Sequence, residues 1–179
     1  NVGIVEVPDK RLFDIDKIIK SKKIIKTAIE FVDIAGLVKG ASKGEGLGNK
    51  FLSNIRNVDA IVHVVRCYEN ENVTHVEGNI DPIRDIEIIE TELILKDIES
   101  ITKRREKIKR EVKAGKRLDE DNTLKMLLEH LNNGENLNKL DIKSAHMKEF
   151  NLLTDKPMLF AVNIDEKQLS NESKTKLLL

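Results

Sequence analysis

Short apolar runs separated by helical patterns limit the folds open to this chain. The runs are AIEFVD at residues 28–33, AIVHVVR at 60–66 and PMLFAVN at 157–163. Loop residues bound each run, and such runs are typical of central strands of a parallel sheet, buried on both faces. A β-rich run at residues 2–7 and a helical pattern at 11–21 come before them. This alternation predicts an α/β fold with a mostly parallel sheet.

The middle of the chain, residues 85–131, is charge-rich and has no strand pattern. Apolar residues recur there at three- and four-residue steps, as in a coiled coil, and Gly115 separates two such stripes. Arg105 occupies one interrupted position of the first stripe. The stripes consist of Ile94, Ile98, Ile101, Ile108 and Val112, and of Leu124, Leu127, Leu128 and Leu131. We expect an antiparallel helical hairpin over residues 85–133, inserted between two parts of an α/β domain, residues 1–84 and 134–179. A helix pair buried in the core is the alternative, which the density of charge disfavours.

Composition excludes several classes of protein. The 31 basic residues balance the 31 acidic ones, so only local patches can attract a charged partner. Cys67 is the single cysteine, which excludes a disulfide framework and fits a reducing cytoplasm. No apolar run approaches the roughly 18 residues of a membrane span. The histidines show no spacing typical of metal ligands; they are His63, His75, His130 and His146.

A glycine-rich stretch, DIAGLVKGASKGEGLG, follows the strand predicted at residues 28–33. In open α/β sheets ligands bind at the carboxyl ends of strands, where the Asp33 carboxylate can hold Mg²⁺ through water. The N–H of Gly36 can approach a phosphate oxygen because no Cβ stands in the way. D-x-x-G alone is a weak motif, and a mobile surface loop is the alternative. The repeated glycines favour a segment that rearranges with the nucleotide state.

The stretch from Asp33 to Leu52 resembles the switch II region of the Obg-related P-loop nucleotidases. Together with HVVRCYEN at residues 63–70, the helical insertion and NIDE at 163–166, it resembles the Obg-like ATPases of the YchF family over essentially the whole chain. The resemblance implies that Asp33 is the Walker B-type acid for Mg²⁺ and that Gly36 senses the γ-phosphate. Leu37 stands where Ras-like enzymes carry a water-orienting Gln, so no catalytic residue is assigned.

The residues after the strand at 157–163 indicate which base is bound. Guanine-specific relatives carry N-K-x-D, whose Asp accepts hydrogen bonds from guanine N1–H and the exocyclic amine. Here Ile164 replaces the Lys and Glu166 replaces the Asp, while Asn163 is kept and braces the loop. The YchF family carries N-x-x-E at this place and favours ATP. A shifted register, with Asp165 reading guanine, is the competing interpretation, and ordinary turn residues are a third.

A basic segment, residues 103–117, holds nine Lys or Arg against two Glu, a net charge of +7. Such a patch near the end of a projecting hairpin is typical of surfaces that bind phosphate backbones. A solvated helix face is the alternative. The predicted RNA or ribosome patch consists of Lys103, Arg104, Lys107, Lys109, Arg110, Lys113, Lys116 and Arg117.

The chain contains no G-x-x-x-x-G-K-[ST] phosphate-binding loop. From the resemblance we expect a fragment of a longer, monomeric, cytoplasmic ATPase, with the Walker A region before it and a TGS domain after it. That protein would hydrolyse ATP, or GTP, with Mg²⁺ around ribosomes, in translation or the stress response. We expect the fragment itself to be inactive. The alternatives are an Obg-type GTPase and an RNA- or ribosome-binding module acting through the hairpin.

Overall fold

The structure is a computed structural model that divides into two compact units, Asn1–Gly36 and Leu37–Leu179. The structure describes the whole chain except residues 35–51, 53, 70–78, 141, 143–145 and 170–179.

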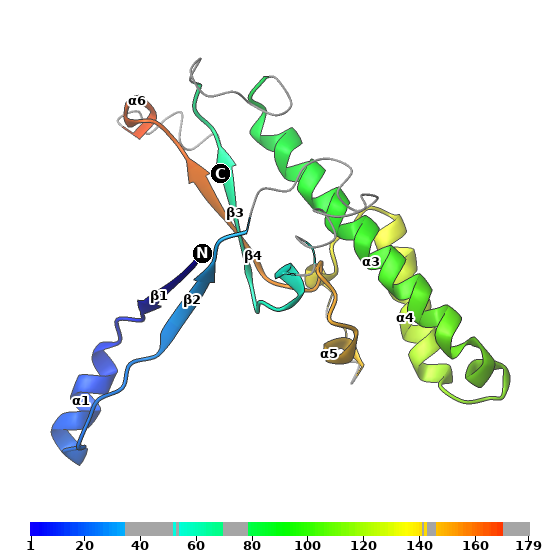
Figure 1. Ribbon diagram of the computed structural model, residues 1–179, viewed down its shortest axis with the longest axis horizontal. Coiled ribbons are helices and arrows are strands. Elements are labelled where there is room, and N and C mark those ends of the chain that lie inside the picture. Colours follow the sequence, from blue (N-terminus) through cyan, green and yellow to red (C-terminus); the bar gives the residue numbers. More distant parts are fainter. Residues whose placement is uncertain (35–51, 53, 70–78, 141, 143–145, 170–179) are drawn as a thin grey trace. The chain divides into compact units, whose positions relative to one another are not determined.

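The first unit is a two-stranded ribbon whose strands are joined through a helix (Figure 1). Strand β1 (Val2–Glu6) is followed by helix α1 (Lys10–Ile19) and strand β2 (Ala28–Val32). Helix α1 begins at Asp9, whose carboxylate accepts a hydrogen bond of 3.0 Å from the Arg11 N–H. This side chain satisfies one of the backbone donors that the first helical turn leaves free.

Strand β2 pairs with β1 in the antiparallel direction, from Val2 opposite Val32 to Glu6 opposite Ala28. All residues of both strands are exposed. The prediction that residues 28–33 form a central strand of a parallel sheet, buried on both faces, is therefore wrong. The apolar run predicts the strand, but its direction is set by the connection, and residues 7–27 turn the chain back along β1.

In the second unit, strands β3 (Ile61–Arg66) and β4 (Met158–Asn163) form a parallel pair. Ile61 lies opposite Met158, and Arg66 lies opposite Asn163. The sequence predicted both strands and their parallel direction, but the predicted burial on both faces is wrong, since Val65 is the only buried residue within these two strands. Because the strands are parallel and in register, their carboxyl ends lie at the same edge.

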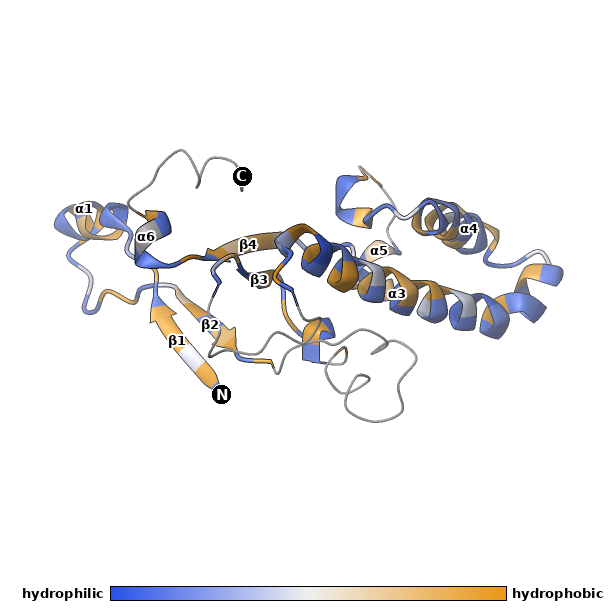
Figure 2. Cartoon of the chain, turned by 90° about the horizontal axis from the view of Figure 1, so that it is seen from above, coloured by the Kyte–Doolittle hydropathy of each residue, from blue (hydrophilic) through white to orange (hydrophobic). Residues whose placement is uncertain are grey.

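Two long helices of the second unit, α3 (Pro82–Lys113) and α4 (Leu118–Asn132), pack side by side and antiparallel (Figure 1). The Asp81 carboxylate caps the start of α3, accepting a hydrogen bond of 3.1 Å from the Arg84 N–H. Gly115 lies between the helices with φ of 76°, a left-handed conformation that suits glycine. Apolar residues mark one side of each helix (Figure 2).

The main core lies between these helices and the segments that follow α4. The stripes predicted from the sequence supply most of it, and Ile98, Val112 and Leu128 are partly buried against it. The helices lie where the stripes predicted them, while the limits 85–133 of a separate inserted domain stay a prediction. The buried members are Ile94, Ile101, Ile108, Leu124, Leu127, Leu131, Leu137, Met147 and Leu152.

Three short elements complete the described part of the second unit. They are the 3₁₀ helix η1 (Leu137–Lys139) and the helices α5 (Met147–Phe150) and α6 (Glu166–Leu169). None of the helices in the described ranges is both long and apolar enough to cross a membrane.

Candidate functional site

The carboxyl ends of β3 and β4 bring two segments together that lie about a hundred residues apart. The Cys67 N–H donates a hydrogen bond of 2.8 Å to the carbonyl of Asn163. The Gln168 side-chain amide donates one of 2.7 Å to the carbonyl of Cys67. The loop that carries the predicted base-recognition residues is therefore tied to the chain directly after β3.

The start of α6 fixes the conformation of this loop. The Gln168 N–H donates to the Asp165 carboxylate at 2.7 Å, and the Asp165 N–H donates to the Gln168 side-chain oxygen at 3.0 Å. This is the reciprocal pattern of a capping box. Asn163 and Glu166 are exposed beside it, and Ile164 is half-buried. One oxygen of Asp165 is thus already engaged by the helix that follows it.

Arg66 and Tyr68 lie at the same edge. The Arg66 guanidinium stacks over the Tyr68 ring, 4.7 Å from its centroid, and Arg66 Nε donates to the Tyr68 carbonyl at 3.1 Å. Arg66 is also paired across the sheet with Asn163. A cation held over an aromatic face is a favourable arrangement, which helps to hold Arg66 and Tyr68 together at the end of β3.

His63 of β3 and Cys67, which directly follows β3, belong to no cluster of metal ligands among the described residues. Burial lowers the pKa of His63, and burial raises the pKa of the Cys67 thiol. Cys67 is half-buried, and a thiol with a raised pKa is a poor nucleophile and a poor metal ligand. Across the described residues there is no group of three or more His, Cys, Asp or Glu that could hold a metal ion.

Asp33, the predicted Mg²⁺ ligand, directly follows β2 in the first unit and is exposed. Its backbone N–H donates to the carbonyl of Asn1 at 2.9 Å, which extends the ribbon by one pair. A single carboxylate fits the way Mg²⁺ is held in nucleotide sites, by one or two carboxylates, waters and phosphates. Gly36 and Leu37 lie outside the described residues.

The predicted basic patch divides into two groups. In the first group each cation has an acidic partner. Arg104 contacts Glu120 at 2.7 Å, and Lys109 contacts Glu106 at 3.0 Å. The remaining pairs are Lys103 with Glu99, and Arg117 with Glu111 and Glu120. The charge of these cations is partly compensated at short range.

The second group consists of Lys107, Arg110, Lys113 and Lys116, which are exposed and have no ion-pair partner within the described ranges. Lys107 and Arg110 lie on the side of α3 that faces away from α4, since Ile101, Ile108 and Val112 form the opposite side. Lys113 lines a hollow between the two helices. The structure thus identifies which cations of the patch are free to meet an anion.

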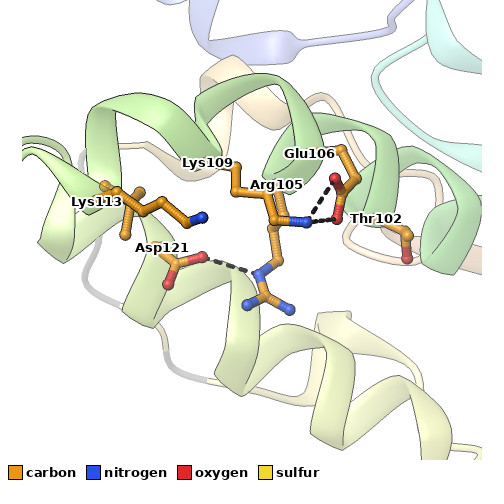
Figure 3. A pocket seen from close by; sticks show the side chains of 7 residues that line it. Thr102, Arg105, Glu106, Lys109, Lys113 and Asp121 are labelled. Atoms are coloured by element: carbon orange, nitrogen blue, oxygen red, sulfur yellow. Dashed lines mark hydrogen bonds and ion pairs between the residues drawn. The ribbon is translucent and has the colours of Figure 1, made fainter.

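Arg105, at the interrupted position of the apolar stripe, donates from Nε to the Asp121 carboxylate at 2.9 Å (Figure 3). This pair lines a hollow of about 330 Å³ between α3 and α4, together with Lys109 and Lys113. The sequence showed the interruption, but it did not reveal the acids of α4 that meet it. Their signal is the acidic run DED at 119–121, at the start of the second helix.

Comparison with known proteins identifies the class. The family described as "50S ribosome-binding GTPase" matches residues 13–95. The solved structure of the Schizosaccharomyces pombe YchF GTPase matches with a TM-score of 0.75 and 36% identity, covering 96% of this chain and 48% of that one. The chain therefore has the α/β fold of the P-loop GTPase class.

Within that class the similarity is to YchF proteins. The chain is 48% identical over 97% of its length to the ribosome-binding ATPase YchF of Bacillus subtilis, and 49% identical over 96% to that of Mycoplasma pneumoniae. It spans about half the length of these relatives, 49% and 48% respectively. The resemblance to the YchF family is confirmed.

Proposed function

We propose that this chain is part of a nucleoside triphosphatase that binds and hydrolyses ATP. The observation that carries the proposal is the loop after β4, where Ile164 and Glu166 replace the Lys and Asp of a guanine-reading motif. The capping bond of Asp165 supports it, because a carboxylate held by Gln168 is less available to guanine in the shifted register. The relatives in Bacillus and Mycoplasma are named ATPases, whereas the Schizosaccharomyces relative is named a GTPase.

The same proposal gives roles to residues that follow β2 in the first unit. Asp33 holds Mg²⁺ through water, and Gly36 contacts the terminal phosphate. When bound, Mg²⁺ would stabilise the negative charge that develops on the phosphate oxygens. Leu37 has no hydrogen-bonding group, so it cannot orient the attacking water, and we assign no catalytic base.

We further propose that the ribosome is the partner and that the hairpin contacts its RNA. Four cations have no acidic partner in the part of the chain that the structure describes, and they support a surface for RNA phosphates. They are Lys107, Arg110, Lys113 and Lys116. The relatives are named ribosome-binding proteins. A role at the ribosome, in translation or the stress response, would place the protein in the cytoplasm. We also propose that the protein is a monomer.

Calorimetry of the full-length protein with ATP and with GTP, at equal Mg²⁺, tests the choice of base. We expect tighter binding of ATP. A strong preference for GTP would show that the alternative, an Obg-type GTPase, is correct. In Asp33→Ala we expect both nucleotides to lose binding when Mg²⁺ is present. That result would support the proposed role of Asp33 in holding Mg²⁺.

A further inference from the structure

One turn of α3 is tied to the segment that leads into β4. The Asp97 side chain is 0% exposed. Its carboxylate accepts hydrogen bonds from the Leu153 N–H at 3.0 Å, the Thr154 N–H at 2.8 Å and the Thr154 hydroxyl at 2.8 Å. A buried carboxylate with three donors holds its partners in place, because any loosening would leave it without them.

The same turn of α3 is tied to residues 56–58. Arg56 donates from Nη2 to the Ser100 hydroxyl oxygen at 2.5 Å, and that hydroxyl donates to the Lys96 carbonyl at 2.8 Å. The Lys156 ammonium donates to the Val58 carbonyl at 2.8 Å. Hydrogen bonds therefore join three segments that are far apart in sequence, and residues 96–100 of α3 form one of them.

The charges at this joint depend on one another. Burial raises the pKa of Asp97, while its hydrogen bonds and the positive charge of Arg56 act in the opposite direction. The removal of Arg56 would leave the carboxylate with less compensation and Ser100 without its donor. A displacement of the Arg56 segment would thus break or strain a hydrogen bond to α3.

Each segment at the joint also leads to a predicted part of the nucleotide site. Arg56 ends a helical stretch that follows the glycine-rich residues 36–48 in sequence. Thr154 leads into β4, which ends at Asn163 and the base-recognition loop. A nucleotide that shifts either segment can bias α3 only through contacts that differ between states. The hydrogen bonds of the joint are the contacts that link these segments to α3.

We propose that the Arg56–Ser100 and Asp97–Thr154 contacts are the joint through which nucleotide binding changes the helical hairpin. Arg56 is a positioning residue in this scheme and does not touch the nucleotide. The inference rests on the proposed function, since it requires that the full-length protein binds a nucleotide.

Hydrogen–deuterium exchange of α3 peptides within residues 96–113, with and without ATP·Mg²⁺, tests the joint in the full-length protein. In the wild type we expect ATP to change the exchange of these peptides. In Arg56→Met we expect that change to be lost, while the affinity for ATP stays within about twofold. Ser100→Ala, a milder change of the same contact, should reduce the ATP-dependent difference and leave the melting temperature nearly unchanged.

The matched control is Arg11→Met, which removes an exposed arginine that pairs with Asp9 in the first unit. It should retain the full ATP-dependent difference. A wild type that binds ATP without any change in α3 would overturn the inference alone, as would an unchanged difference in Ser100→Ala. A wild type that binds neither ATP nor GTP would overturn the proposed function and the inference with it.

Discussion

Asp165 and Gln168 show how a single turn decides what the neighbouring side chains can do. Because they cap each other, α6 begins directly after β4, and Glu166 is exposed in its first turn. Glu166 is one methylene longer than the Asp of a guanine-reading motif. Its carboxylate is therefore displaced from the position that such an Asp would occupy relative to the strand.

The choice of base can be reversed by restoring the guanine motif. The double variant Ile164→Lys/Glu166→Asp recreates N-K-x-D at residues 163–166. We expect the ratio of GTP to ATP affinity to rise by about tenfold or more, because two hydrogen bonds to a carboxylate form with guanine alone. Calorimetry of the full-length protein measures the ratio, and Ile164→Lys alone is the control. An unchanged ratio would contradict the assignment of this loop.

The hairpin should respond to acid through Asp121. Hydrogen bonds from Lys125 and Arg105 lower the pKa of Asp121 below its ordinary value of 3.8. The ionised form therefore stabilises the folded state above 3.8, and this contribution is lost as the pH falls through the lower folded value. In Asp121→Asn the free energy of unfolding should fall less between about pH 5 and pH 3 than in the wild type.

Denaturant unfolding followed by circular dichroism measures this pH dependence. Asp119→Asn is the control, because the Asp119 side chain is exposed and has no ion-pair partner within the described ranges. Equal acid sensitivity of the wild type and Asp121→Asn would refute the prediction.

At the residue scale the sequence predicted some of these side chains and not others. It indicated Asn163 and Glu166 because they follow a recognisable strand. The Asp165–Gln168 cap was not predicted, although the sequence D-x-x-Q is compatible with a capping box. Asp97 and Arg56 could not be predicted, because their partners lie 56 and 44 residues away and no local pattern connects them.

Among the elements, the hairpin depends on consecutive charges as well as on its apolar stripes. Arg104 and Arg105 of α3 meet Glu120 and Asp121 of α4, at 2.7 and 2.9 Å. Both acids are nearly buried, 4% and 6% exposed. Two adjacent pairs fit only one alignment of the helices, so they help to set the register.

The core of the hairpin gives a direct test of packing. Leu127 is 0% exposed, and Leu127→Ala should lower the free energy of unfolding by about 2–5 kcal/mol, since it removes buried methyl groups and leaves a cavity. Met126, the next residue, is 45% exposed, and Met126→Ala should change it by less than about 0.5 kcal/mol. Chemical denaturation of both variants measures the difference. Similar losses of stability in the two variants would mean that the buried interface between α3 and α4 has been wrongly located.

The division of the basic patch predicts unequal effects of equal changes in charge. Lys107→Gln/Lys113→Gln removes two cations that have no acidic partner among the described residues. Lys103→Gln/Lys109→Gln removes two that pair with Glu99 and Glu106. The first variant should weaken association with ribosomes more than the second. The binding that remains should depend less on salt, because cations without an acidic partner are free to replace counterions on RNA.

Co-sedimentation of the full-length protein with ribosomes at several salt concentrations measures this effect. The affinity for ATP serves as the internal control and should not change in either variant. Equal losses in the two variants would show that the ion pairs do not decide which lysines bind.

At the element scale the sequence predicted the strands and the long helices, but not every direction. Apolar spacing located α3 and α4 because a stripe has a period that only a helix satisfies. The prediction of strand direction was wrong for β2, because an apolar run does not show which strand it pairs with or in which direction. The turn from residue 7 to residue 27, which reverses the chain, shows no distinctive short motif in the sequence.

As a whole molecule, the chain spans about half of its YchF relatives. Its sequence contains no G-x-x-x-x-G-K-[ST], the loop that cradles the α and β phosphates in P-loop nucleotidases. The activity we propose therefore belongs to the full-length protein.

We expect the isolated 179-residue chain to show no useful ATP hydrolysis, because the element that binds most of the triphosphate is not part of it. Phosphate release from ATP and Mg²⁺ measures this, with the full-length protein as the positive control. Mg²⁺-dependent turnover by the purified chain would overturn the expectation.

The length of α3 has a mechanical consequence. Between Asp97 and Lys113 the helix rises about 24 Å, at about 1.5 Å per residue. A rotation of α3 by about 10° around Asp97 would carry the backbone of Lys113 through about 4 Å. That distance separates an ammonium in contact with a phosphate from one with water between them. If the proposed joint rotates α3, the cations near the far end of the helix are therefore displaced much further than the residues beside Asp97.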